Sequence, residues 1–381
     1  MKLIVLKNKL YKGCLLASKI ISSKTNLPIL SHLSFTASEE TGLLIESSNL
    51  ELSIRLSIPA KVEIAGQITV PARKFTEYLG SLTDEKVTLE VSHKQITVTS
   101  SQTEARFVTM PSEDFPMIPK INTASGQMII LATQLHQLVK QVVFAATTSD
   151  IHPILSGVLF DTQNENTTIV ATDSFRLSIS DIAMGVDSSF IIPASALTEV
   201  DRLINDSFWE ESDEKVREVV IKLSRDDNQV FFNIGNVELI SRLLEVEYPD
   251  YQKVIPVTHT TKIVTNLAEL IQTIRRTAIF ASRDGQAIKI SFKPSDKSIV
   301  LTAQSVEVGS QTSSIEASIE GDELTLGFNH RYLLEGLESF ATPEITILGN
   351  GKDAPVVFIG NEKEAYRHIV MPMSLSDEEV L

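Results

Sequence analysis

The sequence LPILS at residues 27–31 returns as HPILS at residues 152–156, an offset of 125 residues. Before each copy, apolar residues recur at i, i+3, i+4, i+7 and i+11, which is the spacing of an amphipathic helix. These positions span 10–21 and 135–146, and the same spacing appears again at 267–278. The sequence therefore predicts an internal repeat in which similar helices return at domain-sized intervals.

A second helix is expected later in each third of the chain. A Pro or a polar residue stands near each start, as helix entries favour, in TVPA at 69–72, IIPA at 191–194 and GFNH at 327–330. The helices are expected at 72–81, 194–205 and 330–340. Alternating runs such as 41–48 and 166–172 predict strands, and Asn350-Gly351 predicts a hairpin turn. The pattern indicates an α+β fold in which a β-α-β-β-β unit occurs twice per third.

Each third also closes on a related Pro-containing segment, MP at 110–111 with FP at 115–116, YPDY at 248–251 and MPM at 371–373. Short polar stretches near 120–127 and 256–261 interrupt the pattern. We therefore expect three domains at 1–122, 128–256 and 261–375, followed by an acidic tail at 376–381.

Composition excludes several classes of protein. The chain has 381 residues, of which 43% are hydrophobic and 22% charged, as in globular proteins of two to four domains. No apolar run approaches the length of a signal-peptide core or a membrane span, so we expect a soluble, cytoplasmic protein without a membrane partner. Cys14 is the only cysteine, which excludes an intrachain disulfide and a multi-thiolate metal site.

The charge is distributed unevenly along the chain. The net charge is −15, which by itself argues against a nucleic-acid partner. Segment 7–24, however, holds five lysines and no acidic residue, and the six expected helices together carry +6, which leaves −21 on the strands and loops. A solvated lysine face is the ordinary interpretation of one such helix. If all six helices line one surface, that surface attracts phosphate without reading bases.

The ordered motifs resemble one family, the bacterial DNA polymerase III beta subunit, or sliding clamp. The resemblance covers about residues 1–375 and depends on LPIL at 27–30, VPARKF at 70–75, ATDSFRL at 171–177, YPDY at 248–251, GFN at 327–329 and VMPM at 370–373. It implies three similar clamp domains, each with two helices on antiparallel sheet, in a head-to-tail ring dimer whose helices line a channel around duplex DNA. The implied partners are double-stranded DNA, a second copy, the replicative polymerase, the clamp loader, repair polymerases and other proteins with a clamp-binding motif.

The resemblance implies a hydrophobic pocket that binds short linear peptides. We expect Arg176 to supply donors that fix the peptide backbone, and Met371 and Met373 to supply an adaptable wall. The family often has Gly-His where this chain has Ser174-Phe175, and a basic residue where it has Ser374. The pocket residues carried over are Leu155, Thr172, Ser174, Phe175, Arg176, Leu177, Pro249, Val254, Asn329, Tyr332, Ile369, Val370, Met371, Pro372 and Met373. Several of these, such as Leu155, Leu177 and Val370, could equally be ordinary core.

Two further surfaces follow from the resemblance. For the dimer joint, Lys74 and Phe107 of the first third should meet Ile279 and Phe280 of the last third. For the DNA channel the implied residues are Lys9, Lys12, Lys19, Lys24, Arg73, Lys140, Arg202, Arg275, Arg276 and Arg331. Some of these cations are expected to be surface ion-pair partners instead.

Motifs for catalysis are weak. The seven histidines show no metal-ligand spacing, and GNGK at 349–352 lacks the upstream Gly and the following Ser or Thr of a phosphate loop. Asp150 and Asp173 lack a nucleophile and base that could act with them. We therefore expect no enzyme, no cofactor and no metal site. Two alternatives stay open: a clamp paralogue with a specialised repair or partner-switching role, and a three-domain enzyme with a diverged active site.

Overall fold

The structure is a computed structural model that describes residues 1–21, 27–121, 126–149, 152–163, 166–183, 189–206, 209, 218–224, 227–281, 286–305, 307–360 and 365–374. Within these residues, the elements repeat in the order expected from the sequence. Each third contains two β-α-β-β-β units, and short additional strands lie between the units in the first and last thirds.

The first third contains β1 (Lys2–Leu6), α1 (Lys7–Ser18), β2 (His32–Ser38), β3 (Gly42–Ser48), β4 (Leu52–Ile58), β5 (Ala60–Ile64), β6 (Gly66–Pro71), α2 (Ala72–Ser81), β7 (Lys86–Ser92), β8 (Gln95–Thr99) and β9 (Glu104–Val108). The middle third contains β10 (Gly126–Leu131), α3 (Ala132–Val142), β11 (Gly157–Gln163), β12 (Asn166–Thr172), β13 (Arg176–Ile182), β14 (Phe190–Pro193), α4 (Ala194–Ile204), β15 (Glu218–Ser224), β16 (Gln229–Ile234) and β17 (Val237–Arg242). The last third contains β18 (Thr261–Asn266), α5 (Leu267–Ala278), β19 (Ala287–Lys293), β20 (Ser298–Ser305), β21 (Gly309–Glu316), β22 (Ser318–Gly321), β23 (Leu324–Asn329), α6 (His330–Leu337), β24 (Glu344–Gly349), β25 (Val356–Ile359) and β26 (Tyr366–Val370).

The repeated PILS sequence forms the same local structure in both copies. Residues Pro28–Ser31 and Pro153–Ser156 are single 3₁₀ turns, η1 and η4, and Pro stands at the start of each. In both turns the serine hydroxyl donates a hydrogen bond of 2.6 Å to the proline carbonyl. A local sequence motif therefore specifies the turn, because the bond closes within four residues and needs no partner from elsewhere in the chain.

The expected helices are present, but several of them begin or end at other residues than expected. The helix expected over 10–21 runs from Lys7 to Ser18, and the helix expected over 330–340 ends at Leu337. The Asn350-Gly351 hairpin forms between β24 and β25, but its loop spans 350–355 rather than two residues. The Asn350 side chain is bonded outside the hairpin, because its Oδ1 accepts a hydrogen bond of 2.8 Å from the N–H of Thr260.

The chain forms two compact units that divide the middle third between them. The first unit comprises 1–136 and 195–243, and the second 137–194 and 244–381. In the first unit, β17 pairs with β4 and so extends one sheet across two thirds of the sequence. Arg55 lies at this joint, where its guanidinium contacts Glu46 at 2.9 Å and Glu238 at 2.7 Å and donates to the carbonyls of Ile118 and Pro119.

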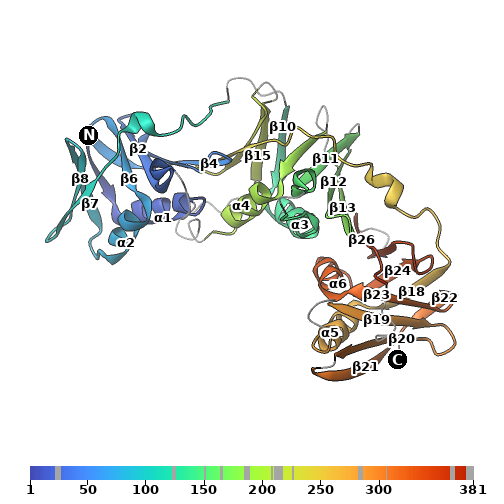
Figure 1. Ribbon diagram of the computed structural model, residues 1–381. Coiled ribbons are helices and arrows are strands. Elements are labelled where there is room, and N and C mark those ends of the chain that lie inside the picture. Colours follow the sequence, from blue (N-terminus) through green and yellow to red (C-terminus); the bar gives the residue numbers. More distant parts are fainter. Residues whose placement is uncertain are drawn as a thin grey trace. The chain divides into compact units, whose positions relative to one another are not determined.

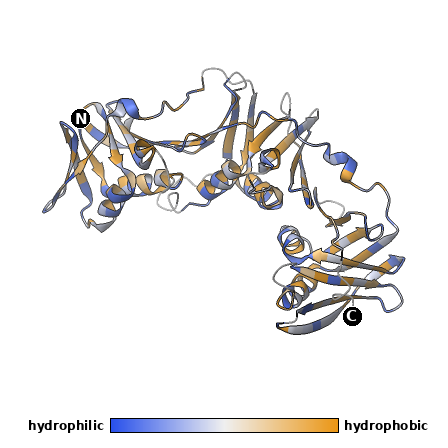
Figure 2. Cartoon of the chain, in the orientation of Figure 1, coloured by the Kyte–Doolittle hydropathy of each residue, from blue (hydrophilic) through white to orange (hydrophobic). Residues whose placement is uncertain are grey.

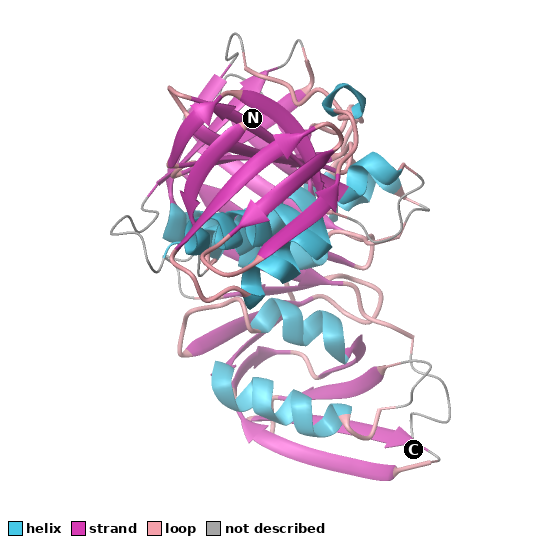
Figure 3. Ribbon diagram, turned by 90° about the vertical axis from the view of Figure 1, so that its left-hand side faces the viewer, coloured by secondary structure: helices cyan, strands magenta, loops and turns pink. Residues whose placement is uncertain are grey.

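In the second unit, β13 pairs with β26 and extends a nine-stranded sheet in the same way. Helices α5 and α6 lie side by side against the strands of the last third (Figures 1 and 3). Asn266 caps α5 by accepting a hydrogen bond of 2.9 Å from the N–H of Glu269. Apolar and polar residues alternate along these elements (Figure 2), as expected for elements with one buried face.

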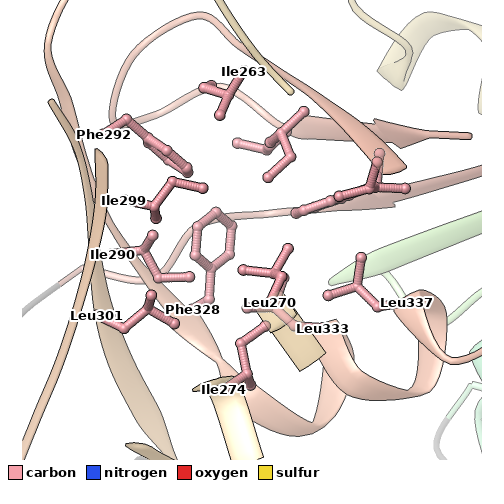
Figure 4. Packing of buried hydrophobic residues seen from close by; sticks show 14 of the residues in the cluster. Ile263, Leu270, Ile274, Ile290, Phe292, Ile299, Leu301, Phe328, Leu333 and Leu337 are labelled. Atoms are coloured by element: carbon pink, nitrogen blue, oxygen red, sulfur yellow. The ribbon is translucent and has the colours of Figure 1, made fainter. Parts of the chain in front are cut away.

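The core of the last third lies between the helices and the sheets. Phe328 from β23 is fully buried and lies among Leu270 and Ile274 of α5 and Leu333 of α6 (Figure 4). Burying one such side chain contributes about 1.5–3 kcal/mol to folding. This core fixes α6 against the sheet whose end carries the candidate site.

Candidate functional site

A cavity of about 280 Å³ opens in the second unit beside the turn between β12 and β13. Most of its surface is aliphatic, aromatic or proline side chain, which favours an apolar occupant. It is lined by Leu155, Thr172, Ser174, Phe175, Arg176, Leu177, Pro249, Asp250, Tyr251, Val254, Pro355, Ile369 and Met371.

The turn at 172–176 forms one wall and is held by its own side chains. Thr172 Oγ1 accepts a hydrogen bond of 3.2 Å from the N–H of Ser174 and donates one of 2.6 Å to the carbonyl of Arg176. Asp173 Oδ1 accepts from the N–H of Phe175 at 2.9 Å and of Arg176 at 3.0 Å. These bonds hold Ser174 at φ +79°, in the left-handed region that side chains disfavour. The turn thereby presents Phe175 with 60% of its surface exposed.

Arg176 lines the cavity, but three nitrogens of its guanidinium are bonded within the protein. Its Nε donates to Asp173 Oδ2 at 3.1 Å, its Nη2 donates to the carbonyl of Phe144 at 2.6 Å, and its Nη1 pairs with Glu335. The side chain is only 8% exposed. Arg176 was expected to donate to a bound peptide, but most of its hydrogen-bonding capacity is used within the protein.

Aromatic rings surround this guanidinium and continue to the rim of the cavity. The rings of Tyr332 and Phe144 lie over the guanidinium carbon at 4.5 and 5.1 Å from their centroids. The Phe175 ring stacks on Tyr332 with centroids 6.4 Å apart and an interplanar angle of 20°. The N–H of Met371 donates to the carbonyl of Phe175 at 2.9 Å. The stacking on Tyr332 thus holds the exposed phenyl ring, and the bond to Met371 holds the backbone that carries it.

His368 is fully buried behind this group. Its Nδ1 lies 2.9 Å from Ser178 Oγ and its Nε2 lies 3.0 Å from the carbonyl of Tyr332. Since a carbonyl can only accept, Nε2 carries the proton and Nδ1 accepts from the serine hydroxyl. Burial lowers the pKa of His368 to about 3, so the ring is neutral at pH 7. Gly336 is required beside it, because a Cβ at that position would lie 2.0 Å from the imidazole Cδ2.

The structure brings most of the carried-over pocket residues together. Those that line the cavity are Leu155, Thr172, Ser174, Phe175, Arg176, Leu177, Pro249, Val254, Ile369 and Met371. The others lie near it in different roles: Asn329 caps α6, Tyr332 covers Arg176, Val370 is fully buried, and Met373 forms an isolated bridge with Gly327. Pro372 lies between Met371 and Met373 and does not line the cavity.

Three lining residues were missed from the sequence. Tyr251 and Asp250 belong to the YPDY segment at 248–251, from which only Pro249 was carried over, so the motif itself could have indicated them. The Tyr251 hydroxyl donates to Asp161 Oδ2 at 2.9 Å, and burial raises the pKa of this tyrosine to about 12. Pro355, in the loop after β24, carries no local signal for a site.

The residues expected at a DNA channel lie on or beside the helices. Lys9, Arg73, Lys140, Arg275, Arg276 and Arg331 are exposed, whereas Lys12 and Arg202 are half-buried. As expected for some of them, several form ion pairs: Lys19 with Asp206, Arg73 with Glu77, Arg202 with Glu199, and Arg275 with Glu338. Lys9, Lys140 and Arg331 make no ion pair within the described part of the chain. Lys24 lies outside the described residues.

The four residues expected at a dimer joint are placed differently from one another. Phe107 packs edge-to-face on Phe75 at 5.3 Å and on Tyr78 at 5.6 Å, so it belongs partly to the core of the first third. Lys74 is exposed and paired with Glu77 at 2.9 Å. Ile279 is 67% exposed at the end of α5, and the half-buried Phe280 packs against the core of the last third.

In the described ranges, no group of three or more His, Cys, Asp or Glu residues is arranged to hold a metal ion. None of the helices in those ranges is long and apolar enough to cross a membrane.

Comparison with known proteins defines the class. Family models of the DNA polymerase III beta subunit match most of the chain: the N-terminal domain at 1–119, the central domain at 130–250 and the C-terminal domain at 252–374. The Beta sliding clamp of Bacillus subtilis (strain 168) is 30% identical over 98% of this chain and 99% of that protein. That of Synechococcus elongatus is 29% identical over 98% and 100%. The fold is therefore the three-domain DNA clamp, of the α+β class expected from the sequence.

Solved structures agree with this class. The crystal structure of the DNA polymerase sliding clamp from Bacillus subtilis matches with a TM-score of 0.90 at 28% identity, over 99% of this chain and 100% of that one. The chain belongs to the DNA polymerase III beta subunit family. The expectation of a DNA sliding clamp, drawn from the ordered motifs, is confirmed.

Proposed function

We propose that this sliding clamp docks partner proteins at the apolar cavity beside the turn at 172–176. The cavity itself is the observation that supports this role. Its volume of about 280 Å³ is close to the lower end of the range for ligand pockets, about 300–1,000 Å³, and its lining is mostly apolar. The partners proposed are the replicative polymerase, the clamp loader, repair polymerases and other proteins that present a short apolar motif.

A peptide titration tests the docking site. We expect the capped neutral peptide Ac-Gln-Leu-Ser-Leu-Leu-NH₂ to bind the full chain, and Leu177→Asp to reduce that affinity by at least tenfold. Leu177 is 3% exposed and lines the cavity, so the variant is checked for folding by circular dichroism. Met371→Ala, at a residue 39% exposed, offers a milder second variant. Failure of the wild-type chain to bind such peptides would refute the docking role.

We also propose that the helices contact duplex DNA without reading its sequence and that the clamp encircles it. The support is chemical: exposed cations on α1, α2, α3, α5 and α6 in a chain whose net charge is −15. Such a clamp is expected to stay on a closed circular DNA and to leave it after the circle is cut. Retention that survives linearisation, measured by gel filtration, would contradict topological binding.

The encircling form requires a closed assembly, and we propose a head-to-tail homodimer. In this assembly Lys74 and Phe107 of one copy face Ile279 and Phe280 of the other. Edge strands support it, because β9 and β21 each end a sheet and leave backbone groups available for pairing. Light scattering of the wild-type chain should give the mass of a dimer, twice 42.0 kDa, and Ile279→Asp should give the mass of a single chain. A wild-type chain that is monomeric at micromolar concentration would count against the ring.

We propose three domains at 1–122, 128–256 and 261–375, with no catalytic activity and no bound cofactor, acting on DNA in the cytoplasm. The acidic tail proposed at 376–381 lies outside the described residues. The three matching family models support the division into thirds.

A further inference from the structure

Arg176 lines the cavity, but its donors point into the protein. Three of its nitrogens are hydrogen-bonded to Asp173, Glu335 and the carbonyl of Phe144. A guanidinium has five N–H donors in one plane, and two aromatic rings lie over this one. A ligand in the cavity would therefore meet little of this cation, since only 8% of the side chain is exposed.

The same guanidinium organises the rim of the cavity. Tyr332 lies over it, and Phe175 in turn stacks on Tyr332. Tyr332 and Glu335 are both on α6, three residues apart, so one ion pair and one cation–π contact attach the same helical turn to Arg176. The position of the exposed Phe175 ring thus depends on a charge buried beneath it.

We propose that Arg176 is a positioning residue, which holds Tyr332 and through it Phe175 as a wall of the cavity and does not itself bind the docked peptide. This inference rests on the proposed docking function. It also restricts the chemistry of the docked peptide. The peptide is anchored by uncharged apolar side chains against Phe175, and an acidic group near Arg176 does not increase its affinity.

Glu335→Gln gives opposite results for the two possible roles of Arg176. The substitution removes the carboxylate that pairs with the guanidinium and keeps the size of the side chain. If Arg176 positions Tyr332, the affinity for the capped neutral peptide Ac-Gln-Leu-Ser-Leu-Leu-NH₂ falls on the order of tenfold. If Arg176 is a ligand donor, releasing it leaves the affinity unchanged or raises it. The neutral peptide removes the long-range effect of the changed net charge.

The matched control is Asp181→Asn. Asp181 lies near the other end of β13 from Arg176, is not among the residues that line the cavity, and pairs with Arg367 of β26 at 2.8 Å. Asp181→Asn replaces an acid by its amide, as Glu335→Gln does. We expect it to change the peptide affinity by less than about twofold. Asp173→Asn is a second test variant, because its amide oxygen can still accept the two turn hydrogen bonds while the charge beside Arg176 is lost. It should weaken binding as Glu335→Gln does.

A double-mutant cycle separates positioning from general destabilisation. If Arg176 and Glu335 act through the tyrosine ring, Tyr332→Leu weakens binding and Glu335→Gln adds almost nothing in the Tyr332→Leu background. Full additivity of the two effects, or tighter binding by Glu335→Gln, overturns the inference. Absence of peptide binding by the wild-type chain instead refutes the docking function on which the inference rests, so the two failures are distinguishable.

Discussion

The turn at 48–52 in the first unit and the turn at 172–176 in the second unit have the same backbone. In the first, Ser48 Oγ accepts from the N–H of Leu50 at 3.1 Å, and Asn49 Oδ1 accepts from Glu51 at 3.0 Å and from Leu52 at 2.7 Å. Thr172 and Asp173 make the corresponding bonds in the second turn. The residue in the middle has φ +77° in one turn and +79° in the other.

The two turns differ in the burial and charge of the side chains at their fourth and fifth residues. The first turn ends on the exposed Glu51 and on Leu52, which is 8% exposed and belongs to the core. The second ends on Phe175, which is 60% exposed, and on Arg176, which carries a charge into the protein. The repeat therefore supplies the turn, and two side chains that depart from it create the wall of the cavity.

Arg176→Leu makes the second turn resemble the first and should have the largest effect. The change leaves Asp173, Glu335 and the Phe144 carbonyl without their common partner. We expect the free energy of unfolding, from urea denaturation, to fall by about 3 kcal/mol. Peptide affinity should fall by at least tenfold in the same variant.

Arg367→Leu is the control for this change, because its ion pair with Asp181 joins side chains that are 36% and 41% exposed. It should cost less than about 1 kcal/mol. Equal losses in the two variants would mean that Arg176 contributes no more than a surface ion pair, and the contrast between the turns would lose its basis.

His368, which is buried in the second unit near Arg176, makes the free energy of unfolding depend on pH. Its pKa is about 3 in the folded chain, lowered mainly by burial and then by Arg176, and about 6.5 when unfolded. The unfolded chain therefore takes up the proton first as the pH falls. The stability linked to this group is complete above pH 6.5 and is lost progressively down to about pH 3.

From pH 7 to pH 5 this linkage predicts a loss of about 2 kcal/mol in the free energy of unfolding. His368→Gln cannot titrate and should remove that part of the pH dependence, whereas His259→Gln, at an exposed position, should leave it in place. The measurement is urea unfolding of the three chains at both pH values. Parallel pH profiles for wild type and His368→Gln would show that the imidazole is not held neutral.

The sequence predicted the parts of the fold that are encoded locally. The helix over 72–81 and the strand over 166–172 have the bounds expected, because Pro71 and an alternating apolar pattern define them within a few residues. The ends of α1 and α6 were placed too far along the chain. Helix α6 stops at Leu337, and the hydroxyl of Ser339 donates to the carbonyl of Lys140, 199 residues away.

The cavity was predicted in part for the same reason. Residues of the 171–177 and 248–251 motifs could be carried over because the motifs are contiguous. The hydrogen bonds of Arg176 within the protein could not be predicted, because its partner Glu335 is 159 residues away in the sequence and its partner Phe144 is 32 residues away. A motif identifies an arginine near a pocket, but only the folded chain shows whether its donors face the pocket or the protein.

Replacing the middle residue of each turn by glycine should have the smallest effect on the free energy of unfolding. The two substitutions test whether the turns at 48–52 and 172–176 are equivalent. Leu50 and Ser174 both hold a left-handed backbone conformation, which costs a side chain about 1–2 kcal/mol. Glycine removes this cost but also gives the unfolded chain more freedom, so Leu50→Gly and Ser174→Gly should each raise the free energy of unfolding by at most about 1 kcal/mol. Both side chains are exposed, so little burial is lost.

Because the hydrogen bonds of the second turn come from Thr172 and Asp173, Ser174→Gly should leave peptide affinity within about twofold of wild type. Similar gains in urea denaturation for the two variants would show that the strain belongs to the repeated turn. A gain for Leu50→Gly together with a loss for Ser174→Gly would show instead that the Ser174 side chain supports the wall of the cavity, and that the middle residue contributes to the difference between the turns as the last two residues do.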